Sequence, residues 1–363
     1  MRALLETVHV VESFAGGVFD FIVDLIKNTP ECHHTVIYSL RDDTPSDFSG
    51  YFPRNTSFIE WKNASREIHP VVDLRALQEL RKIVNSLRPV DVIHLHSSKA
   101  GFLGRVSSRL AGVHDKVIYT PHGVSFLRKD VSPARRRLFV WIERFGARLG
   151  GTIVACSRSE MGEFQKHGIK AMFINNGIDC GSPDDICHSK GSGKIVIGTA
   201  GRITAPKNPS LFNRIASTFN CDDRVSFVWI GDGELRQEIV SENVCVTGWM
   251  SRASVVQELK KIDIYLSTSL WEGLPLSVLQ AMCFGKPLVL SDCVGNRDLV
   301  VPEKNGVLYR SAQEAVSRIN EMIRTDCLGT WGYNSRRLLL ENFTLNKMVC
   351  EYMSLYKSIA RKS

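Results

Sequence analysis

The stretch that decides the fold runs from Leu270 to Asp292 and reads LWEGLPLSVLQAMCFGKPLVLSD. It opens with a carboxylate, Glu272, in a turn that Gly273 and Pro275 shape. An apolar helical pattern, LSVLQAM, follows the turn, and a short apolar strand, KPLVLSD, follows the helix. A strand end, a helix and a further buried strand in this order are typical of βα units in a parallel sheet.

The same alternation continues in both directions from this stretch. Helix-length amphipathic patterns such as VFDFIVDLIKN and VVDLRALQELRKIVNSL separate short apolar, β-branched runs. The strand candidates before residue 180 are TVHVVES, HTVIYSL, SFIEW, VDVIHLHS, KVIYTPHG, GTIVACS and AMFINNG. Those after it are KIVIGTAGR, VSFVWIGDGE, NVCVTGW, DIYLSTS, KPLVLSD and GVLY. The sequence therefore predicts an α/β fold with parallel sheets.

The alternation stops between residues 176 and 192, where NGIDCGSPDDICHSKGSG is rich in Gly, Asp and Ser and is typical of a linker. We therefore expect two doubly wound domains joined near residue 185. The predicted boundaries are 1–180 for the N-terminal domain and 181–342 for the C-terminal domain. The final segment, 343–363, contains an amphipathic helix that we expect to cross back to the N-terminal domain.

Composition excludes several classes of protein. The 363 residues are 44% hydrophobic and 23% charged, which is typical of globular proteins. No apolar run is long enough to predict a transmembrane helix, and Glu6 and His9 interrupt the N-terminus too early for a signal peptide. The ten cysteines contain no Cys-x-x-Cys pair and several lie in apolar runs. We therefore expect small buried residues in a reducing compartment, without a disulfide framework or a zinc site.

Positive charge is concentrated in one segment of a chain whose net charge is +8. From Arg128 to Arg148, only Asp130 and Glu143 oppose the basic residues. The periodicity there predicts a helix whose apolar face carries Leu138, Trp141, Ile142, Phe145 and Leu149. Two interpretations stay open: the apolar face packs on the N-terminal sheet and the arginines are only solvated, or the helix lies on an anionic membrane. In the second case the expected membrane contacts are Arg135, Arg136 and Arg137.

Two cations follow the strand IVIGTAG. Arg202 and Lys207 lie in AGRITAPKNP, and Pro209 is suited to the first turn of the next helix. In doubly wound sheets, ligands bind outside the carboxyl ends of the strands, so this loop is suited to a phosphate or a diphosphate. The alternative is two solvated surface cations.

The opening stretch adds hydrogen-bonding groups for a different part of a ligand. Glu272 repels phosphate but can accept hydrogen bonds from sugar hydroxyls, and Gln280 can both accept and donate. The free amides at the start of the following helix favour an anion. A hydroxyl-rich ligand that also carries a diphosphate is a nucleotide sugar. The alternative is that Glu272 is a charge at a helix start and Gln280 a surface polar residue.

At this point the chain resembles a known family. AGRITAPKN, IGDGEL, VTGW, STSLWEGLPLSVLQAM, FGKPLVLSD and NGVLY resemble the C-terminal half of the retaining glycosyltransferases of family 4, the group 1 transferases. The motifs GGV, DVIHLHSSKAGFLGR, TPHG, VACSRSE and NNGID fit the N-terminal half. The resemblance covers nearly the whole chain. It implies the GT-B fold, in which two doubly wound Rossmann-like domains face each other across a cleft. The N-terminal domain, 1–180, would bind the acceptor, and the C-terminal domain, 181–342, would bind the nucleotide sugar.

The resemblance also implies roles for individual residues. Glu272 would contact hydroxyls of the donor sugar, and Gln280 would hold the ribose where relatives usually carry a second glutamate. Glutamine lacks the charge-assisted strength of a carboxylate, so nucleotide affinity is the property that this departure affects. The catalytic set would be Arg202, Lys207, Glu272 and His122. The further donor-binding residues would be Gly16, Gly17, Gly201, Gly273, Leu274, Pro275 and Leu276. The acceptor side would carry His96, Ser97 and Lys99. For His122 the alternative is a histidine satisfied at a strand end.

The implied reaction moves a sugar from a nucleoside diphosphate sugar, with UDP as the favoured nucleotide, to a hydroxyl of a glycan or lipid-linked acceptor. The anomeric configuration would be retained. The sequence contains no Asp-x-Asp motif, so we expect no metal and no cofactor. By analogy the setting is O-antigen, capsule or exopolysaccharide assembly on a polyprenyl diphosphate carrier, in the cytoplasm or at the inner membrane face, without nucleic acid. The alternatives are a nucleotide-sugar epimerase and a silent sugar-nucleotide binding protein. A dehydrogenase is disfavoured because no Gly-x-Gly-x-x-Gly follows the first strand.

Overall fold

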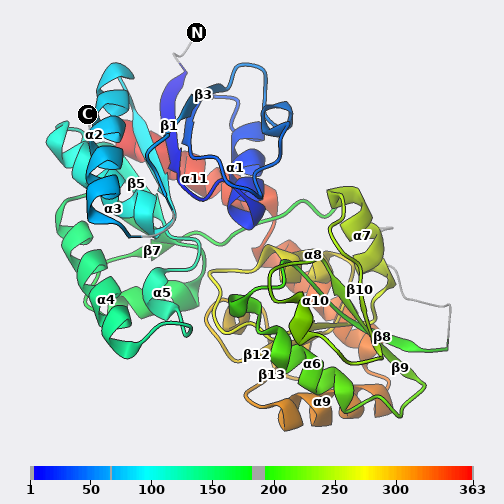
Figure 1. Ribbon diagram of the computed structural model, residues 1–363. Coiled ribbons are helices and arrows are strands. Elements are labelled where there is room, and N and C mark those ends of the chain that lie inside the picture. The colour runs from blue at the N-terminus through cyan, green and yellow to red at the C-terminus, as the bar shows by residue number, and fades with distance from the viewer. Residues whose placement is uncertain (1–3, 66–67, 182–192, 362–363) are drawn as a thin grey trace. The chain divides into compact units, whose positions relative to one another are not determined.

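The computed structural model describes residues 4–65, 68–181 and 193–361. The chain divides into two compact units (Figure 1). Unit 1 comprises Met1–Leu127, Val131–Asn176 and Leu345–Ser363, and unit 2 comprises Arg128–Asp130 and Gly177–Thr344. The chain thus passes from the first sheet to the second at Asn176, and the expected junction near residue 185 lies outside the described residues.

Unit 1 is built on a seven-stranded sheet with the order β3-β2-β1-β4-β5-β6-β7, in which all pairs are parallel. The strands are β1 Leu5–Val11, β2 Cys32–Tyr38, β3 Ser57–Glu60, β4 Val92–His96, β5 Val117–Thr120, β6 Thr152–Ala155 and β7 Met172–Phe173. The helices are α1 Gly16–Lys27, α2 Pro70–Ser86, α3 Ser98–Leu110, α4 Pro133–Arg148, α5 Arg158–Lys166 and α11 Leu345–Ala360. The predicted alternation of strands and helices is therefore confirmed in this unit.

Helices cover both faces of the unit 1 sheet. One apolar core lies against α2, α3 and α4, and a second core lies against α1 and α11. The alternation of side chains along each strand explains the division: Val8 and Val10 of β1 enter the first core, whereas Val11 enters the second. The C-terminal segment therefore completes the apolar cover of the first sheet, although it follows the whole of unit 2 in the chain.

Unit 2 has a six-stranded parallel sheet with the order β10-β9-β8-β11-β12-β13. Its strands are β8 Ile195–Ala200, β9 Val225–Ile230, β10 Val244–Val246, β11 Ile264–Ser267, β12 Leu288–Ser291 and β13 Gly306–Tyr309. Its helices are α6 Pro209–Ser217, α7 Arg252–Lys261, α8 Leu276–Cys283, α9 Ala312–Arg324 and α10 Leu328–Asn342. Apolar residues of α6 and α9 pack on one face of this sheet. Strand order reverses between β8 and β11, so the carboxyl ends of these two strands form the switch point where such sheets bind ligands.

The face that α4 buries differs from the prediction. Phe139, Glu143 and Gly146 are buried, whereas Trp141 and Phe145 are 60% and 39% exposed. A buried ion pair explains why the Glu143 side of α4 faces the core. Arg105 Nη2 of α3 lies 2.8 Å from Glu143 Oε2, and both side chains are buried.

Further contacts of this ion pair fix the rotation of α4. Tyr119 Oη donates to Glu143 Oε1 at 2.8 Å. The Cζ atom of Arg105 packs so close to Gly146 that a Cβ there would lie 2.6 Å from it. The pair turns the helix so that Trp141 and Phe145 face outward. Of the predicted apolar face, Ile142 packs on the core, whereas the prediction is wrong for Leu138, Trp141 and Phe145.

The cysteines also depart from expectation. Cys180 and Cys283 form a disulfide within unit 2, with their Cα atoms 5.3 Å apart. Cys245 is exposed although it lies in an apolar run, whereas Cys156 is buried as expected. The predicted absence of disulfides is therefore wrong, and Cys187 lies outside the described residues.

Candidate functional site

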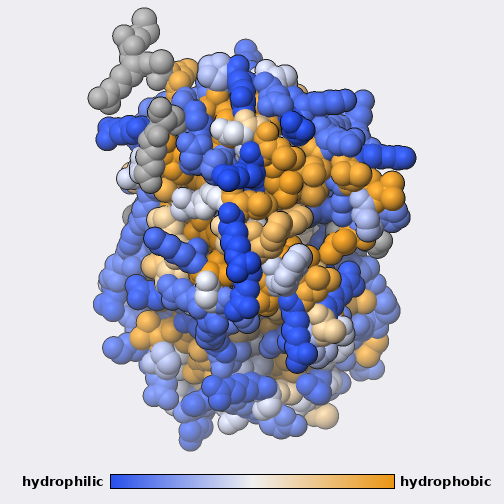
Figure 2. Space-filling view, turned by 90° about the vertical axis from the view of Figure 1, so that its left-hand side faces the viewer, coloured by the Kyte–Doolittle hydropathy of each residue, from blue (hydrophilic) through white to orange (hydrophobic). Residues whose placement is uncertain are grey.

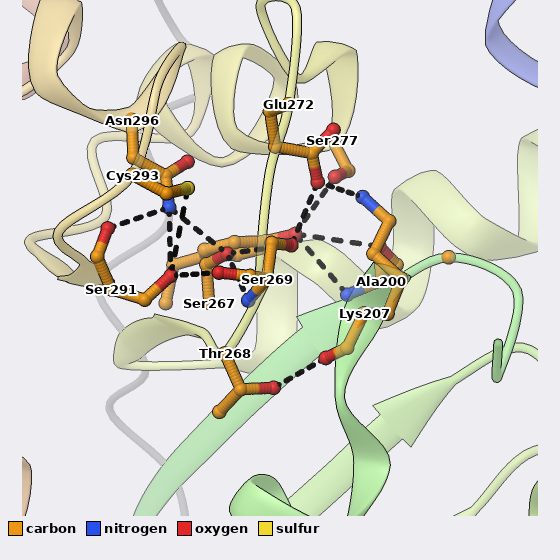
Figure 3. Close-up of polar contacts among 12 residues, drawn as sticks. Ala200, Lys207, Ser267, Thr268, Ser269, Glu272, Ser277, Ser291, Cys293 and Asn296 are labelled. Atoms are coloured by element: carbon orange, nitrogen blue, oxygen red, sulfur yellow. Dashed lines mark hydrogen bonds and ion pairs between the residues drawn. The ribbon is translucent and has the colours of Figure 1, made fainter. Parts of the chain in front are cut away.

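The switch point of unit 2 brings together the two charged residues that the sequence singled out there. Lys207 ends the 3-10 helix η5, Ala205–Lys207, which follows β8, and Glu272 lies in the turn between β11 and α8. Lys207 Nζ lies 2.6 Å from Glu272 Oε1 (Figure 3). Residues 65 positions apart in the chain therefore meet as an ion pair at the edge where a ligand of this sheet binds.

The charge state of Lys207 is set by this contact. Burial would lower the pKa of Lys207, but the charge and hydrogen bond of Glu272 outweigh burial, so the pKa is raised above its ordinary value. The ammonium group therefore stays protonated at neutral pH. It has three donors, and one of them suffices for Glu272.

A second hydrogen bond orients the carboxylate. Ser269 Oγ donates to Glu272 Oε1 at 2.7 Å. Among the described residues, both hydrogen bonds to the carboxylate thus reach Oε1. The second oxygen, Oε2, takes part in neither of these hydrogen bonds.

Hydrogen bonds to the main chain hold the loops around the ion pair. Thr268 Oγ1 donates to the carbonyl oxygen of Lys207 at 2.7 Å, and the Leu270 amide donates to the Pro206 carbonyl at 2.8 Å. Ser291 Oγ at the end of β12 donates to the carbonyl of Ser269 at 2.6 Å (Figure 3). The ends of three neighbouring strands are thereby linked, so the ion pair is attached to a fixed frame.

A glycine that sequence reasoning did not single out sets the position of the Glu272 turn. Gly295 has φ +84, and a Cβ there would lie 2.7 Å from the Gly273 carbonyl oxygen and 2.9 Å from Glu272 Cβ. Only glycine allows this approach and this backbone conformation together. Ser269 and Asn296 were missed as well. Asn296 Nδ2 donates to the Ser291 carbonyl at 3.0 Å and lies 3.5 Å from Ser267 Oγ at the end of β11, a contact that spans 29 residues of the chain. The one signal in the sequence was the glycine of SDCVGN, directly after a strand.

The helix α8 starts beside the ion pair without a cap. Pro275 precedes it, no side chain caps its N-terminus, and its first turn, beginning at Leu276, holds no acidic residue. The Val278 amide donates to the Pro275 carbonyl at 3.1 Å, so the amides of Leu276 and Ser277 are the ones suited to an anion. Gly273 and Leu274 are buried in the turn.

Three further residues of the expected donor site lie in this unit. Gly201 and Arg202 follow β8, and the carbonyl of Gly201 accepts from Trp229 Nε1 at 2.8 Å. Arg202 is half-buried. Gln280 is half-buried one turn before the end of α8, and its side chain forms none of the hydrogen bonds given for the described residues.

The glycines expected in unit 1 begin α1. Gly16 has φ +55, and both Gly16 and Gly17 are exposed. No side chain caps this helix, and no acidic residue lies in its first turn. The end of β1 therefore presents backbone amides that a phosphate can approach.

The residues expected on the acceptor side of unit 1 are engaged in internal contacts. His96 is fully buried and both of its ring nitrogens bond other histidines, so it offers no nitrogen to an acceptor. Ser97 Oγ donates to Glu12, and Lys99 Nζ lies 2.6 Å from Asp73 of α2. The predicted acceptor contact of the His96 side chain is therefore not supported by this geometry.

His122 is half-buried at the end of β5 and adopts φ 54. Its Nε2 lies 3.0 Å from His96 Nδ1, and its Nδ1 lies 3.5 Å from Cys156 Sγ. Burial lowers the pKa of His122 to about 3, so the ring is neutral. A ligand near this residue would therefore meet its backbone or a ring edge rather than a nitrogen.

One group of side chains has spacing that could suit a metal ion. His9, His94 and His96 each offer a ring nitrogen, and these atoms lie within 4.8 Å of one another. Two of the nitrogens, His9 Nδ1 and His96 Nε2, already face each other at 3.0 Å as a hydrogen bond. All three rings are fully buried, and burial is the main cause that lowers their pKa values.

Arg135 and Arg137, two of the predicted membrane contacts, are exposed on α4, and Arg136 is half-buried. Within the part of the chain that the structure describes, no helix is both long and apolar enough to cross a bilayer.

Both halves of the chain match families of known function. Residues 16–177 match the family described as "Glycosyl transferase 4-like domain", and residues 194–325 match "Glycosyl transferases group 1". The chain is 29% identical over 322 residues to the UDP-Gal:alpha-D-GlcNAc-diphosphoundecaprenol alpha-1,3-galactosyltransferase of Escherichia coli, covering 80% of this chain and 81% of that protein. It is 27% identical to the Escherichia coli O-antigen biosynthesis glycosyltransferase WbnH, covering 79% of this chain and 81% of that protein.

Solved structures share the fold. Anabaena Alr3699/HepE in complex with UDP and glucose superposes with a TM-score of 0.79 at 19% identity, covering 98% of this chain and all of that one. The lipopolysaccharide outer core galactosyltransferase WaaB superposes with a TM-score of 0.73 at 16% identity, again covering 98% of this chain and all of that one. With two Rossmann-like units, and with both halves matched by these families, the chain belongs to the group 1 glycosyltransferases of family 4 and has the GT-B fold.

Proposed function

We propose that this glycosyltransferase moves a sugar from a nucleoside diphosphate sugar, with UDP as the favoured nucleotide, to a hydroxyl of a lipid-linked saccharide. The anomeric configuration is retained. The observation that carries the proposal is the pair of Lys207 and Glu272 at the switch point of unit 2, next to the uncapped start of α8. A cation, a carboxylate and free helix amides at one strand edge suit a ligand that joins a diphosphate to a sugar.

In this proposal, different residues stabilise the leaving diphosphate and hold the transferred sugar. Lys207 and Arg202 would stabilise the negative charge that develops on it, together with the first amides of α8. Removing one preorganised donor of this kind typically lowers the rate about 10²- to 10³-fold. Glu272 Oε2 would accept a hydroxyl of the transferred sugar while Ser269 and Lys207 hold Oε1. Gln280 would contact the ribose. No Asp-x-Asp motif is present, so these cations take the place of a metal in the proposal.

The names of relatives support the choice of donor and acceptor. The Escherichia coli galactosyltransferase is named for UDP-Gal and for a diphosphoundecaprenol-linked acceptor, and HepE was solved with UDP. WbnH is named for O-antigen biosynthesis. We therefore propose the same setting, assembly of a surface polysaccharide on a polyprenyl diphosphate carrier.

The test is a transfer assay with UDP-, GDP- and ADP-sugars, with and without a synthetic lipid-diphosphate-linked saccharide. Transfer that depends on the acceptor, with the α or β configuration of the donor preserved in the product by NMR, supports the proposal. Lys207→Ala should abolish most of this transfer. The control is Lys261→Ala, since Lys261 on α7 pairs with Glu258 at the surface, and its side chain is 66% exposed. Equal loss in both variants would remove the role of Lys207.

The same assay decides between the proposal and its alternatives. An epimerase on this fold would convert the donor without any acceptor. A silent binding protein would bind the donor, giving a thermal shift, without turnover; the replacement of the family's second glutamate by Gln280 is the feature that favours it.

We also propose that α4 attaches unit 1 to an anionic membrane. Leu138, Trp141 and Phe145 are 48%, 60% and 39% exposed, and the Trp141 and Phe145 rings stack with centroids 5.6 Å apart. Figure 2 shows hydrophobic residues gathered on the side of the molecule that lies at the left of Figure 1, with hydrophilic side chains among them. Exposed aromatic residues on a helix with Arg135, Arg136 and Arg137 suit the interface of anionic lipids.

Vesicle sedimentation tests this attachment. Each cation near an anionic surface contributes about 1 kcal/mol, so binding should weaken with salt. We expect binding to vesicles that contain phosphatidylglycerol and little binding to pure phosphatidylcholine. Reversing Arg135, Arg136 and Arg137 to Glu should release the protein, whereas Arg224→Glu, at an exposed site in unit 2, should not. Equal binding to both vesicle types would contradict the electrostatic part of the proposal.

A further inference from the structure

Four histidines form a continuous row of hydrogen bonds on the face of the unit 1 sheet that α1 and α11 cover. His34 Nδ1 lies 3.1 Å from His9 Nε2, and His9 Nδ1 lies 3.0 Å from His96 Nε2. The row ends with His96 Nδ1, 3.0 Å from His122 Nε2. The four rings come from β2, β1, β4 and the residues directly after β5, which are neighbours in this order in the sheet.

The register of the strands explains why the rings meet. His34 pairs with Thr7, two residues before His9, and His96 pairs with Val11, two residues after His9. Each step to the next strand therefore advances the row by two residues and keeps it on one face. The centroids of consecutive rings lie 5.2, 5.3 and 5.3 Å apart, close to the spacing of roughly 4.8 Å between strands. The row therefore runs diagonally across the sheet, from His34 to His122 at the carboxyl edge.

The contacts of His34, at the end of the row farthest from the carboxyl edge of the sheet, determine which nitrogen of each ring carries the proton. His34 Nε2 lies 3.3 Å from the carbonyl oxygen of Thr29, which can only accept. It also lies 2.9 Å from Thr29 Oγ1, whose own hydrogen goes to the Leu25 carbonyl at 2.7 Å. His34 therefore donates from Nε2, and in a neutral ring its Nδ1 accepts. The same assignment follows for each next ring, so His9, His96 and His122 all carry their proton on Nε2.

The contacts of His122, at the other end of the row, agree with this direction of the hydrogen bonds. Burial lowers the pKa of all four rings, to about 4 for His34 and about 3 for His122, so they are neutral near pH 7. Burial also raises the pKa of the Cys156 thiol well above its ordinary value, so the thiol keeps its proton. It can therefore donate to Nδ1 of His122, the one acceptor that remains at the end of the row.

Two other uses of the row fit the contacts less well. A proton conduit needs an exit, but the His34 end closes on Thr29, which is fully buried and bonded to a main-chain carbonyl of α1. A metal site at His9, His94 and His96 would have to break the bond between His9 and His96. The arrangement is instead suited to holding one geometry.

We propose that the row is a positioning device that fixes His122 as the neutral Nε2–H tautomer and holds its backbone at the carboxyl edge of unit 1. His122 has φ 54, in a left-handed region that residues other than glycine seldom adopt, so it needs support from its side chain. His34, His9 and His96 are then positioning residues for the transfer reaction. The link to the reaction rests on the proposed function and on the catalytic role that the family resemblance implies for His122.

Side-chain ¹⁵N NMR of the whole protein at pH 7 tests the assignment without any assay of activity. We expect His34, His9, His96 and His122 each to show a protonated Nε2 and an unprotonated Nδ1. An Nδ1–H tautomer or an imidazolium in the row would overturn the proposal. So would shifts of these signals on addition of Zn²⁺ alone, because they would indicate a metal site.

Variants test the coupling along the row. His9→Phe removes the middle of the row, and the tautomer of His122 should become mixed. His9→Gln, which keeps a donor and an acceptor on one planar group, should restore the single tautomer. The matched control is His94→Phe: His94 is equally buried and lies on the same face, but bonds Tyr356 and Thr120 and not the row. It should leave the His122 signals unchanged.

An activity assay separates the locked tautomer of His122 from its proposed effect on the transfer reaction. With a working transfer assay, His9→Phe should lower kcat about tenfold with little change in the donor KM, and His9→Gln should recover it. Unchanged kcat with a mixed His122 tautomer would overturn the positioning role. If no donor supports transfer by the unmodified protein, the proposed function fails, while locked tautomers and the effect of His9→Phe on them would still establish the device.

Discussion

Acidification should destabilise unit 1 well above the pH at which its carboxylates titrate. The buried histidines are neutral in the folded protein because burial lowers their pKa values, whereas in the unfolded chain they titrate near 6.5. Below that pH the unfolded chain binds more protons than the folded one. The free energy of unfolding therefore falls as the pH falls.

The magnitude follows from the shifts. At pH 5.5, each histidine whose folded pKa lies at about 4 or lower should reduce the free energy of unfolding by roughly 1.3 kcal/mol relative to pH 7.5. His34 and His122, whose pKa values fall to about 4 and about 3, together give roughly 2.6 kcal/mol. His9, His94 and His96 act in the same direction, because burial lowers their pKa values as well. Glu12 has the opposite sign, because burial raises its pKa and the folded protein then holds a proton more tightly. We therefore expect a loss of at least roughly 2 kcal/mol.

Hydrogen exchange measured by mass spectrometry can assign this loss to one unit. Peptides from β1 and β4 should show a lower free energy of opening at pH 5.5 than at pH 7.5, after correction for intrinsic exchange. Peptides from β8 and β11 are the internal control, since the described part of unit 2 contains no histidine. A loss below 1 kcal/mol in unit 1, or an equal loss in unit 2, would refute the reasoning. His34→Gln should reduce the pH dependence of unit 1 by about one proton.

Three further outcomes concern the site in unit 2. Arg202→Ala and Lys207→Ala should each lower kcat/KM at least tenfold with little change in thermal stability; near-normal kinetics in both would remove the diphosphate assignment. Glu272→Gln should cripple transfer, whereas Gln280→Glu should be tolerated and should tighten nucleotide binding measured by calorimetry; the reverse pattern would mean that the two roles are exchanged. Gly295→Ala should destabilise unit 2 by about 1–3 kcal/mol, because a left-handed backbone and a clash with the Glu272 turn coincide, and a neutral effect in thermal denaturation would contradict the close approach.

The sequence predicted those features that depend on local pattern. Strand and helix alternation gave both sheets, and the loops after strands gave Lys207 and Glu272, because ligands of parallel sheets lie at one edge. Features that depend on strand order or on distant partners were not predicted. The row of histidines needs β2, β1, β4 and β5 to be neighbours, and the rotation of α4 depends on Arg105, which lies in another helix. The role of Gly295 arises from a loop that reaches the Glu272 turn from the next strand.

The place of α11 in unit 1 has a consequence for how this chain is made. Met348, Tyr352, Met353 and Tyr356 of α11 belong to the core beneath the first sheet, and Tyr356 Oη lies 2.7 Å from His94 Nδ1. The ribosome makes these residues roughly 170 positions after Asn176, which takes roughly 10–30 s at ordinary rates of synthesis. Throughout that interval the face of the first sheet that α1 partly covers lacks the apolar residues of α11. The first unit to be translated is therefore completed only after the second, and part of its apolar core stays exposed on the nascent chain until α11 emerges.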